Sequence, residues 1–253
     1  ELDGVEQACF LVIKGQTKNI DIIRYDLDAL EKPVYSFLCF FWAIVSDVDL
    51  ESEKIRWIGE IRFHLWAFWM VFKLRKYRGT FKYCGEEIKN KDQQLNSVQE
   101  EDISRRIEEE KKEEGEVQET QEKEYDFSYF SVNNTKFAGA GMNNAPLSKI
   151  DDGHMDIVIQ EGDEVGRTKV LKFMLNFEEG QYFDNNGDIN SRLAMSYKKA
   201  KNFTLKPDLD FLPQNEDGSP DFDSQTFGWY SIDGEKYPPC QVKGATINKG
   251  LAV

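Results

Sequence analysis

The segment from Ser46 to Phe63, SDVDLESEKIRWIGEIRF, holds a set of charged side chains that could bind a charged ligand. Its acidic and basic residues interleave between two apolar runs: Asp47, Asp49, Glu51, Glu53 and Glu60 alternate with Lys54, Arg56 and Arg62, between Phe37–Val45 and Phe63–Phe72. Such carboxylates and guanidinium groups could contact a charged ligand beside an apolar surface. They could equally form ion pairs three and four residues apart on a surface helix. Spacing alone leaves both interpretations open.

Other chemical motifs are incomplete in this sequence. His64 and His154 are the only histidines, so a histidine-based nucleophile or a multi-histidine metal site is hard to build. The run Asp184–Asp188 is similar to the start of a calcium loop, but Ile189 stands where that loop needs glycine. We therefore expect a turn there and no metal site. No GxxxxGK[ST] motif occurs, so nothing in the chain is expected to hold a triphosphate unaided.

The composition of the chain excludes some classes of protein. The 253 residues are 40% hydrophobic, which is enough for at least one substantial core. A net charge of -14 argues against nucleic acid as a partner. Four cysteines stand far apart, which favours reduced thiols in the cytosol. The apolar runs are shorter than the roughly 20 residues that cross a bilayer, so we expect a cytoplasmic protein that is soluble or peripheral to membranes.

The first third of the chain predicts two strands and a long helix. The runs Ala8–Ile13 and Ile20–Ile23, separated by a turn at Lys14-Gly15, are typical of a β-hairpin. A helix is expected to begin near Glu51 and to end before Gly79. In contrast, residues 85–126 are dominated by Glu, Lys and Gln and cannot bury enough apolar surface to fold independently. We expect an acidic, disordered insertion there, which holds most of the excess negative charge.

Beyond the insertion, strand patterns alternate with turn signals. The expected strands are Phe127–Val132, Met155–Gln160, Asn202–Leu205 and Trp229–Ile232, with one helix over Lys169–Phe177. This order predicts an α+β, β-rich fold: an antiparallel two-layer β-sandwich with a few packed helices. Residues 1–84 and 127–253 are expected to form that one domain together.

Several of these motifs resemble those of the sphingosine kinases. The similarity is carried by Asp47–Lys54 with Arg56, Gly59-Glu60, Arg62-Phe63 and Tyr77-Arg78-Gly79, and further by Lys14-Gly15 with Asp21, Ala145-Pro146 with Asp152-Gly153, Leu171–Gly180 and Ile232–Glu235. It covers the chain apart from the acidic insertion and parts of the loop from Pro207 to Asp223. The resemblance implies the C-terminal, lipid-binding lobe of a kinase of the wider diacylglycerol kinase and sphingosine kinase superfamily. The N-terminal lobe that holds the ATP motif and the catalytic aspartate is not found, so we expect a fragment that begins within a longer protein.

The same resemblance implies roles for individual residues. Asp49 would bind the amine and hydroxyl of a sphingoid base, and Arg56 and Arg62 would touch the phosphates of ATP, used with Mg²⁺. The turn Asp233-Gly234-Glu235 would contact the nucleotide, although its sequence is also that of an ordinary hairpin turn. The acyl tunnel would be lined by Phe63, Phe173, Met174, Phe177 and Tyr182, each of which could instead be ordinary core.

The function implied is transfer of the γ-phosphoryl group of ATP to a sphingoid base, giving sphingosine 1-phosphate, although this fragment alone should be inactive. A ceramide or diacylglycerol kinase is the nearest alternative, and Asp49 argues against it because a neutral headgroup has no use for an extra carboxylate. A non-catalytic lipid-binding or scaffold protein is the alternative from another class. Peripheral membrane contact through Phe68, Trp69 and Phe72 is plausible, although burial of these aromatics in the core is the simpler expectation. Oligomeric state is left open.

Overall fold

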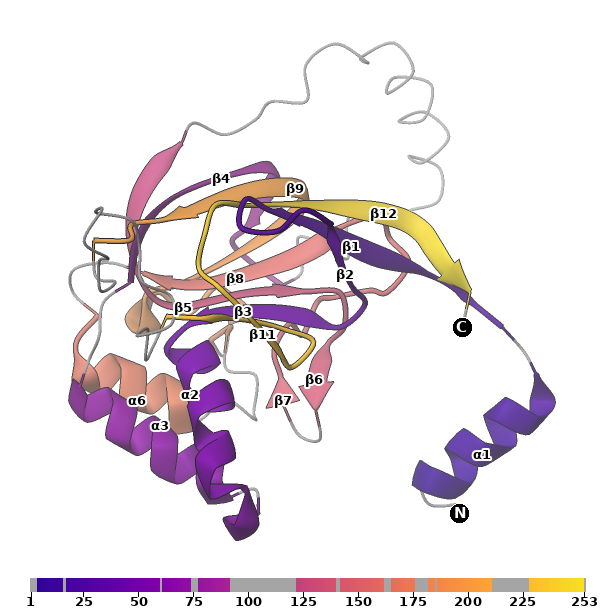
Figure 1. Cartoon of the computed structure of the whole chain (residues 1–253), viewed down its shortest axis with the longest axis horizontal. Coiled ribbons are helices and arrows are strands. Elements are labelled where there is room, and N and C mark those ends of the chain that lie inside the picture. The colour runs from indigo at the N-terminus through magenta and orange to yellow at the C-terminus, as the bar shows by residue number, and fades with distance from the viewer. Residues whose placement is uncertain are drawn as a thin grey trace.

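The structure is a computed structural model of the whole chain (Figure 1). It describes residues 4–15, 17–59, 61–73, 77–91, 122–139, 142–161, 165–175, 182–184, 186–210 and 228–252. The helices in chain order are α1 (Gly4–Lys14), α2 (Ile44–Ser52), the 3₁₀ helix η1 (Glu53–Ile58), α3 (Ile61–Lys73), α6 (Arg167–Leu175) and the 3₁₀ helix η3 (Ser191–Leu193). The strands are β1 (Asn19–Leu27), β2 (Val34–Ser36), β3 (Cys39–Ala43), β4 (Tyr77–Ile88), β5 (Lys123–Asn133), β6 (Phe137–Gly139), β7 (Met142–Asn143), β8 (Met155–Glu161), β9 (Met195–Pro207), β10 (Tyr230–Ile232), β11 (Glu235–Tyr237) and β12 (Val242–Ala252).

The long strands form one antiparallel sheet that folds back on itself into two layers. Its order is β11-β10-β3-β5-β4-β9-β12-β1-β2, and β8 pairs with both β5 and β9. We call β11, β10, β3, β5 and β8 the first layer, and β4, β9, β12, β1 and β2 the second layer. The predicted α+β antiparallel sandwich with a few helices is therefore confirmed.

The two layers are joined because β5 and β9 each change neighbours along their length. β5 pairs with β4 up to Phe127, with β8 from Phe127 onward and with β3 from Tyr129 onward. β9 pairs with β8 through its first residues and with β12 through Asn202–Leu205. The register of β4 against β9 shifts between Cys84 and Gly85. Gly85 suits this bulge because an added Cβ would lie 2.0 Å from the Lys199 carbonyl oxygen.

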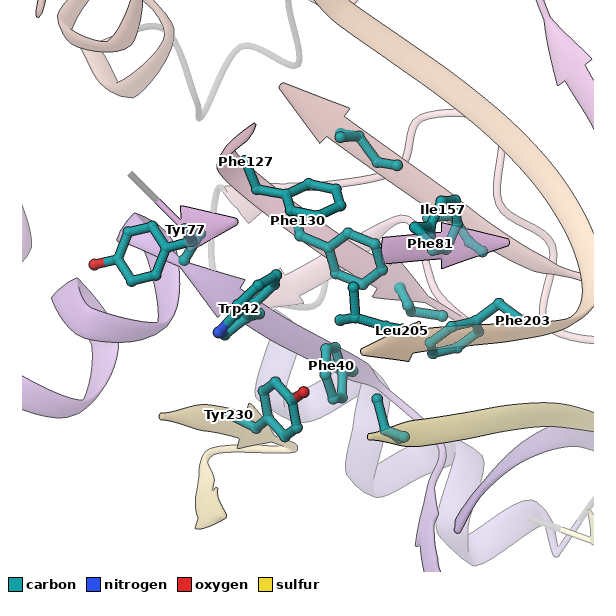
Figure 2. Close-up of a cluster of buried hydrophobic side chains, with 14 of the residues drawn as sticks. Phe40, Trp42, Tyr77, Phe81, Phe127, Phe130, Ile157, Phe203, Leu205 and Tyr230 are labelled. Carbon is teal, nitrogen blue, oxygen red and sulfur yellow. The ribbon is translucent and has the colours of Figure 1, made fainter. Parts of the chain in front are cut away.

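Aromatic side chains fill the space between the layers, and we call this set the main core. Figure 2 shows Phe40, Trp42, Phe130, Ile157 and Tyr230 from the first layer facing Phe81, Phe203 and Leu205 from the second. The rings of Phe81 and Phe130 meet across the layers with centroids 5.4 Å apart. Burial of each such ring contributes about 1.5–3 kcal/mol, so this core is the main source of the sandwich's stability.

The first layer is buried on its other face as well. Every residue of β3 is buried, and β8 is buried from Met155 to Gln160. Alternate residues therefore build a second apolar group behind the layer, which we call the second cluster: Cys39, Phe41, Val45, Ile88, Tyr129, Ala145, Val158, Phe173, Tyr182, Leu193, Met195 and Tyr197. Helices α2, α3 and α6 lie together below the sandwich in Figure 1, with α3 contacting both α2 and α6.

The helix expected from Glu51 to before Gly79 is instead two α-helices and a 3₁₀ helix. The strongly apolar run that precedes it forms β3 and passes directly into α2 at Ala43, which has a φ of 68°. Gly59 then separates η1 from α3 with a φ of 75°. Glycine adopts this left-handed conformation without a steric penalty, so it allows the chain to turn between the two helices.

The strand expected over Ala8–Ile13 was wrong, because these residues lie in α1. An unbroken apolar run has no alternation, so its periodicity does not separate a strand from a helix. Lys14-Gly15 is the end of that helix: the Gly15 N–H donates to the carbonyls of Leu11 and Val12, and its φ is 62°. The predicted hairpin is also wrong, since β1 pairs with β12 and β2.

The strands extend into both ends of the expected insertion. β4 continues to Ile88 and β5 already begins at Lys123, whereas residues 92–121 lie outside the described residues. A disordered insertion therefore stays a prediction for that interval. Within the described ranges, no helix combines the length and hydropathy needed to cross a bilayer.

Candidate lipid-binding site

Asp49 lies on α2, and contacts with the segment before β10 fix the position of this helix. The Ser46 hydroxyl donates to the Trp229 carbonyl at 2.6 Å. The indole N–H of Trp42, at the end of β3, donates to the Gly228 carbonyl at 3.2 Å. These bonds join the β3–α2 junction to a segment more than a hundred residues away, so the orientation of α2 depends on the closed sandwich.

Asp47, in the first turn of α2, anchors the same junction. Its carboxylate is 1% exposed and accepts hydrogen bonds from the Gly228 N–H at 2.7 Å and from the Tyr77 hydroxyl. Figure 2 shows Tyr77 at the edge of the main core with its hydroxyl pointing away from the other rings. The positive end of the helix dipole also favours a carboxylate here. Both oxygens of the Asp47 carboxylate therefore accept hydrogen bonds that stabilise the fold.

Asp49 differs from Asp47 in having one oxygen that no described residue engages. Its side chain is half-buried, and its Oδ2 accepts a hydrogen bond from the Ser231 hydroxyl at 2.8 Å. Within the described residues, this is the only hydrogen bond to the Asp49 carboxylate. A partly desolvated carboxylate with a free oxygen can bind a cationic or hydrogen-bonding ligand.

The environment of Asp49 raises its pKa above the ordinary value. Burial has the largest effect, because it disfavours the charged form. The hydrogen bond from Ser231 and the positive charge of Arg62 act in the opposite direction, and Glu53 raises the pKa further. A cationic ligand at Asp49 would replace the lost hydration and favour the ionised carboxylate.

The second cluster begins directly beneath Asp49. Val45 lies one helical turn before Asp49 on the same face of α2 and belongs to that cluster. Cys39 is buried in it, and burial together with the charges of Asp233 and Asp49 raises the pKa of the Cys39 thiol. The site therefore combines a half-buried carboxylate with an adjoining cluster of buried apolar side chains, and these are the two kinds of group with which a cationic amphiphile interacts.

Three of the predicted tunnel residues meet in this cluster. The ring centroid of Phe173 on α6 lies 4.8 Å from that of Tyr129 and 5.9 Å from that of Tyr182. Met174 is partly buried against the cluster. Phe63 lies on α3, but its side chain is outside the described residues, as is the whole of Phe177. The lining role of all five stays a prediction.

The two predicted phosphate contacts lie close to Asp49 along the chain. The guanidinium group of Arg62 pairs with the Glu53 carboxylate, and the Arg62 side chain is largely buried. Arg56 lies on η1, and its side chain is outside the described residues. A phosphate that reaches Arg62 would therefore share its guanidinium group with Glu53 or displace the Glu53 carboxylate from it.

Asp233 lies in the β10–β11 turn and has a structural role there, whereas the sequence predicted only a contact with the nucleotide. Its carboxylate accepts from the Ser36 hydroxyl at 2.7 Å and from three successive backbone N–H groups, those of Phe37, Leu38 and Cys39. It therefore ties this turn to the β2–β3 turn.

The turn itself has the geometry that its sequence predicted. Asp233 and Gly234 have φ values of 49° and 84°, as a two-residue hairpin turn requires. Glu235 is exposed, so of the three predicted nucleotide contacts it offers the accessible carboxylate.

The described residues do not fit a resident metal ion. Across them, no group of three or more His, Cys, Asp or Glu side chains is placed to hold one. The turn expected at Asp184–Asp188 is present: Asp184 Oδ1 accepts from the N–H groups of Asn186 and Asp188. The Mg²⁺ that is expected to accompany ATP therefore has no set of ligands among the described residues.

Ser231, Gly228 and Tyr77 are the partners that sequence reasoning missed. Each contacts the acidic segment from a position at least 30 residues away, and none forms a recognisable motif with it. The only local signal was the alternation of β10, in which Tyr230 and Ile232 are apolar and Ser231 is polar.

Comparisons with known proteins agree with this fold. Residues 109–218 match the family described as the YegS C-terminal NAD kinase beta sandwich-like domain. A crystal structure of a Bacillus anthracis protein, provisionally assigned as a diacylglycerol kinase, is similar over 99% of this chain and 61% of that chain, with a TM-score of 0.53 and 16% identity. At this identity the structural likeness supports the fold alone.

Two curated relatives match nearly the whole chain, and others match a shorter part of it. Sphingosine kinase 1 of Arabidopsis thaliana is 24% identical over 258 residues, covering 97% of this chain and 50% of the relative. Sphingosine kinase 1 of Rattus norvegicus is 48% identical over 52 residues, 21% of this chain and 14% of the relative. The chain thus spans about half the length of the plant relative. Over nearly its whole length the chain is therefore similar in sequence to sphingosine kinases, and residues 109–218 match the YegS C-terminal family.

Proposed function

We propose that this chain is the lipid-binding lobe of an ATP-dependent kinase that phosphorylates a sphingoid base to give sphingosine 1-phosphate. Asp49 carries the proposal, because its half-buried carboxylate keeps one oxygen available beside the second cluster. A sphingoid base has an ammonium group next to its primary hydroxyl and one long apolar chain. Its ammonium would pair with Asp49 while its chain extends over Phe173, Met174 and Tyr182, with Phe63 and Phe177 as further candidates.

The phosphoryl group would arrive on the other side of the headgroup. The hydroxyl oxygen of the lipid forms a bond to the γ-phosphorus, the bond between that phosphorus and the β,γ-bridging oxygen breaks, and ADP leaves. The hydroxyl proton passes to a general base that we expect outside this chain. Arg62, whose charge already acts on Asp49, and Arg56 would stabilise the phosphates, and Glu235 would face the nucleotide.

A matched pair of lipids tests this proposal in the full-length protein. Sphinganine and N-acetylsphinganine share the chain and the primary hydroxyl, but the acetylated lipid has no ammonium group. We expect kcat/KM to be at least about 100-fold lower for N-acetylsphinganine, since removing one partner of a desolvated charge pair costs roughly 3–5 kcal/mol. Phosphoryl transfer from radiolabelled ATP measures both rates.

The same measurement separates the alternative functions. Equal rates on the two lipids, or faster transfer to a diacylglycerol, would support the ceramide or diacylglycerol kinase alternative. Binding of sphinganine without any transfer from ATP would support the non-catalytic lipid-binding or scaffold alternative. The relatives named as sphingosine kinases favour the first proposal over both.

We further propose that α3 brings the site to a membrane surface, where a lipid substrate resides. Five apolar side chains on α3 are more than half exposed: Ile61, Leu65, Phe68, Trp69 and Phe72. The expectation that the last three would be buried is therefore wrong. Trp57 on the preceding η1 is 84% exposed. A helix face of this kind binds the interface of a bilayer by burying its aromatic residues.

Phe68→Glu tests the membrane contact. We expect roughly tenfold weaker binding to liposomes, because burial of one aromatic ring is lost and a charge is added. Co-sedimentation with phosphatidylcholine and phosphatidylserine vesicles measures the binding. Leu251→Glu is the matched control, since Leu251 is an exposed apolar residue on β12. Equal loss in both variants would count against a role for α3.

A further inference from the structure

Ser231 is a buried polar residue in the middle of the short strand β10. It is fully buried in β10, between Tyr230 and Ile232, whose side chains belong to the main core. Because side chains alternate along a strand, Ser231 faces the opposite side of the first layer. Its partner across the sheet is Phe41, a member of the second cluster.

The hydroxyl of Ser231 is directed at Asp49. Its Oγ donates to Asp49 Oδ2 at 2.8 Å, the one hydrogen bond that the described residues make to this carboxylate. Ser231 is fully buried, and this bond uses the one proton that its hydroxyl can donate. Its influence on a ligand must therefore act through Asp49.

We propose that Ser231 is a positioning residue for the headgroup site: it holds Oδ2 of Asp49 so that the other carboxylate oxygen faces the ammonium group of the lipid, and it keeps that carboxylate ionised. This inference rests on the proposed function. Without the hydroxyl, the carboxylate could rotate about its last side-chain bond and would lose a donor that stabilises its charge. The hydrogen bond indeed opposes the effect of burial on the pKa of Asp49.

Other charged groups near Asp49 do not replace this donor. Arg62 on α3 is paired with Glu53 on η1 and acts on Asp49 through its charge. Asp47 on α2 is engaged by Gly228 and Tyr77. Cys39 on β3 is acted on by the charges of both Asp49 and Asp233, and neither Cys39 nor Asp233 supplies a positive charge.

Ser231→Ala and Ser231→Thr test the proposal in the full-length protein. Affinity for sphinganine in nonionic micelles is measured by calorimetry between pH 5.5 and 8.5. For Ser231→Ala we expect roughly threefold to tenfold weaker binding at pH 6, a smaller loss at pH 8, and a displacement of the acid limb to higher pH. Ser231→Thr keeps the hydroxyl and should give the wild-type dependence of affinity on pH. A merely structural role would not predict this dependence on pH.

Asp49→Asn, measured in parallel, separates this inference from the proposed function. If Asp49→Asn abolishes binding but Ser231→Ala leaves the pH profile unchanged, or weakens binding equally at every pH, the positioning role is wrong and the headgroup site stands. The same conclusion follows if the threonine variant behaves like the alanine variant. If Asp49→Asn binds sphinganine like the wild type, both the inference and the proposed function are overturned.

Discussion

Asp49→Asn is expected to lower kcat/KM for sphinganine by roughly 100- to 1,000-fold in the full-length protein. The substitution removes the carboxylate that is proposed to pair with the lipid ammonium and would leave that ammonium desolvated without a partner, at a cost of about 3–4 kcal/mol. Initial rates at varied sphinganine and ATP concentrations measure the effect. The KM for ATP should change less than about twofold, and loss of ATP affinity instead would refute the assignment of Asp49 to the lipid.

The same substitution should not destabilise the fold. Burial raises the pKa of Asp49, so the folded state binds its proton more tightly than the unfolded state does. The stability that protonation contributes is present at low pH and is lost as the pH rises through the folded-state pKa. At pH 7 the ionised Asp49 therefore opposes folding, and a neutral asparagine removes that penalty.

Asp47→Asn is the matched control for Asp49→Asn. It places an amide where Gly228 and Tyr77 donate to a fully buried carboxylate, so we expect a loss of about 2–4 kcal/mol in the free energy of unfolding. Urea unfolding at pH 7 compares the two variants. Equal destabilisation of both would show that Asp49 also serves mainly to hold the fold.

Asp233→Asn is expected to lower the free energy of unfolding by about 2 kcal/mol. Asparagine keeps the oxygen that accepts from Ser36, Leu38 and Cys39, but its amide group would meet the Phe37 N–H, donor against donor. Asp233→Ala removes every acceptor and should cost more, about 3–5 kcal/mol. Denaturant unfolding followed by tryptophan fluorescence measures both losses.

Glu235→Gln separates the structural role of this turn from the predicted nucleotide contact. Glu235 is exposed, so its replacement should leave the free energy of unfolding within about 0.5 kcal/mol of the wild type. If Glu235 contacts the nucleotide, the KM for ATP rises in this variant. A stable Asp233→Asn protein with weakened ATP binding would instead place the nucleotide contact on Asp233.

Sequence patterns predicted an element correctly where its residue types all favour the same local structure. The Asp233-Gly234 turn was confirmed because its residue types fit the positive φ values that a tight hairpin needs. The apolar run of α1 was misassigned because it has no alternation, although Lys14-Gly15 held the signal of a helix end. β12 was not predicted, since much of this strand is exposed and polar and its pairing is decided by β1 and β9.

From the sequence, the candidate site could be predicted only as the segment from Ser46 to Phe63, without the role of each residue in it. Asp47 and Asp49 stand two residues apart with the same side chain, and nothing local separates the buried anchor from the half-buried site residue. Their difference arises from Gly228, Tyr77 and Ser231, which the closed sandwich brings to α2 from distant positions. Resemblance to a family selected Asp49, and its role in binding the lipid stays a prediction.

The pairing of β12 between β1 and β9 has a consequence for biosynthesis. Strand β1 stays an open edge of the second layer until residues after Val242 have left the ribosome, because β12 is what joins it to β9. During translation the nascent chain must therefore hold unpaired strand edges until Val242–Ala252 has emerged, a state that invites aggregation. Contacts so distant along the chain also favour slow folding, so chaperone assistance would benefit this protein most before β12 has emerged.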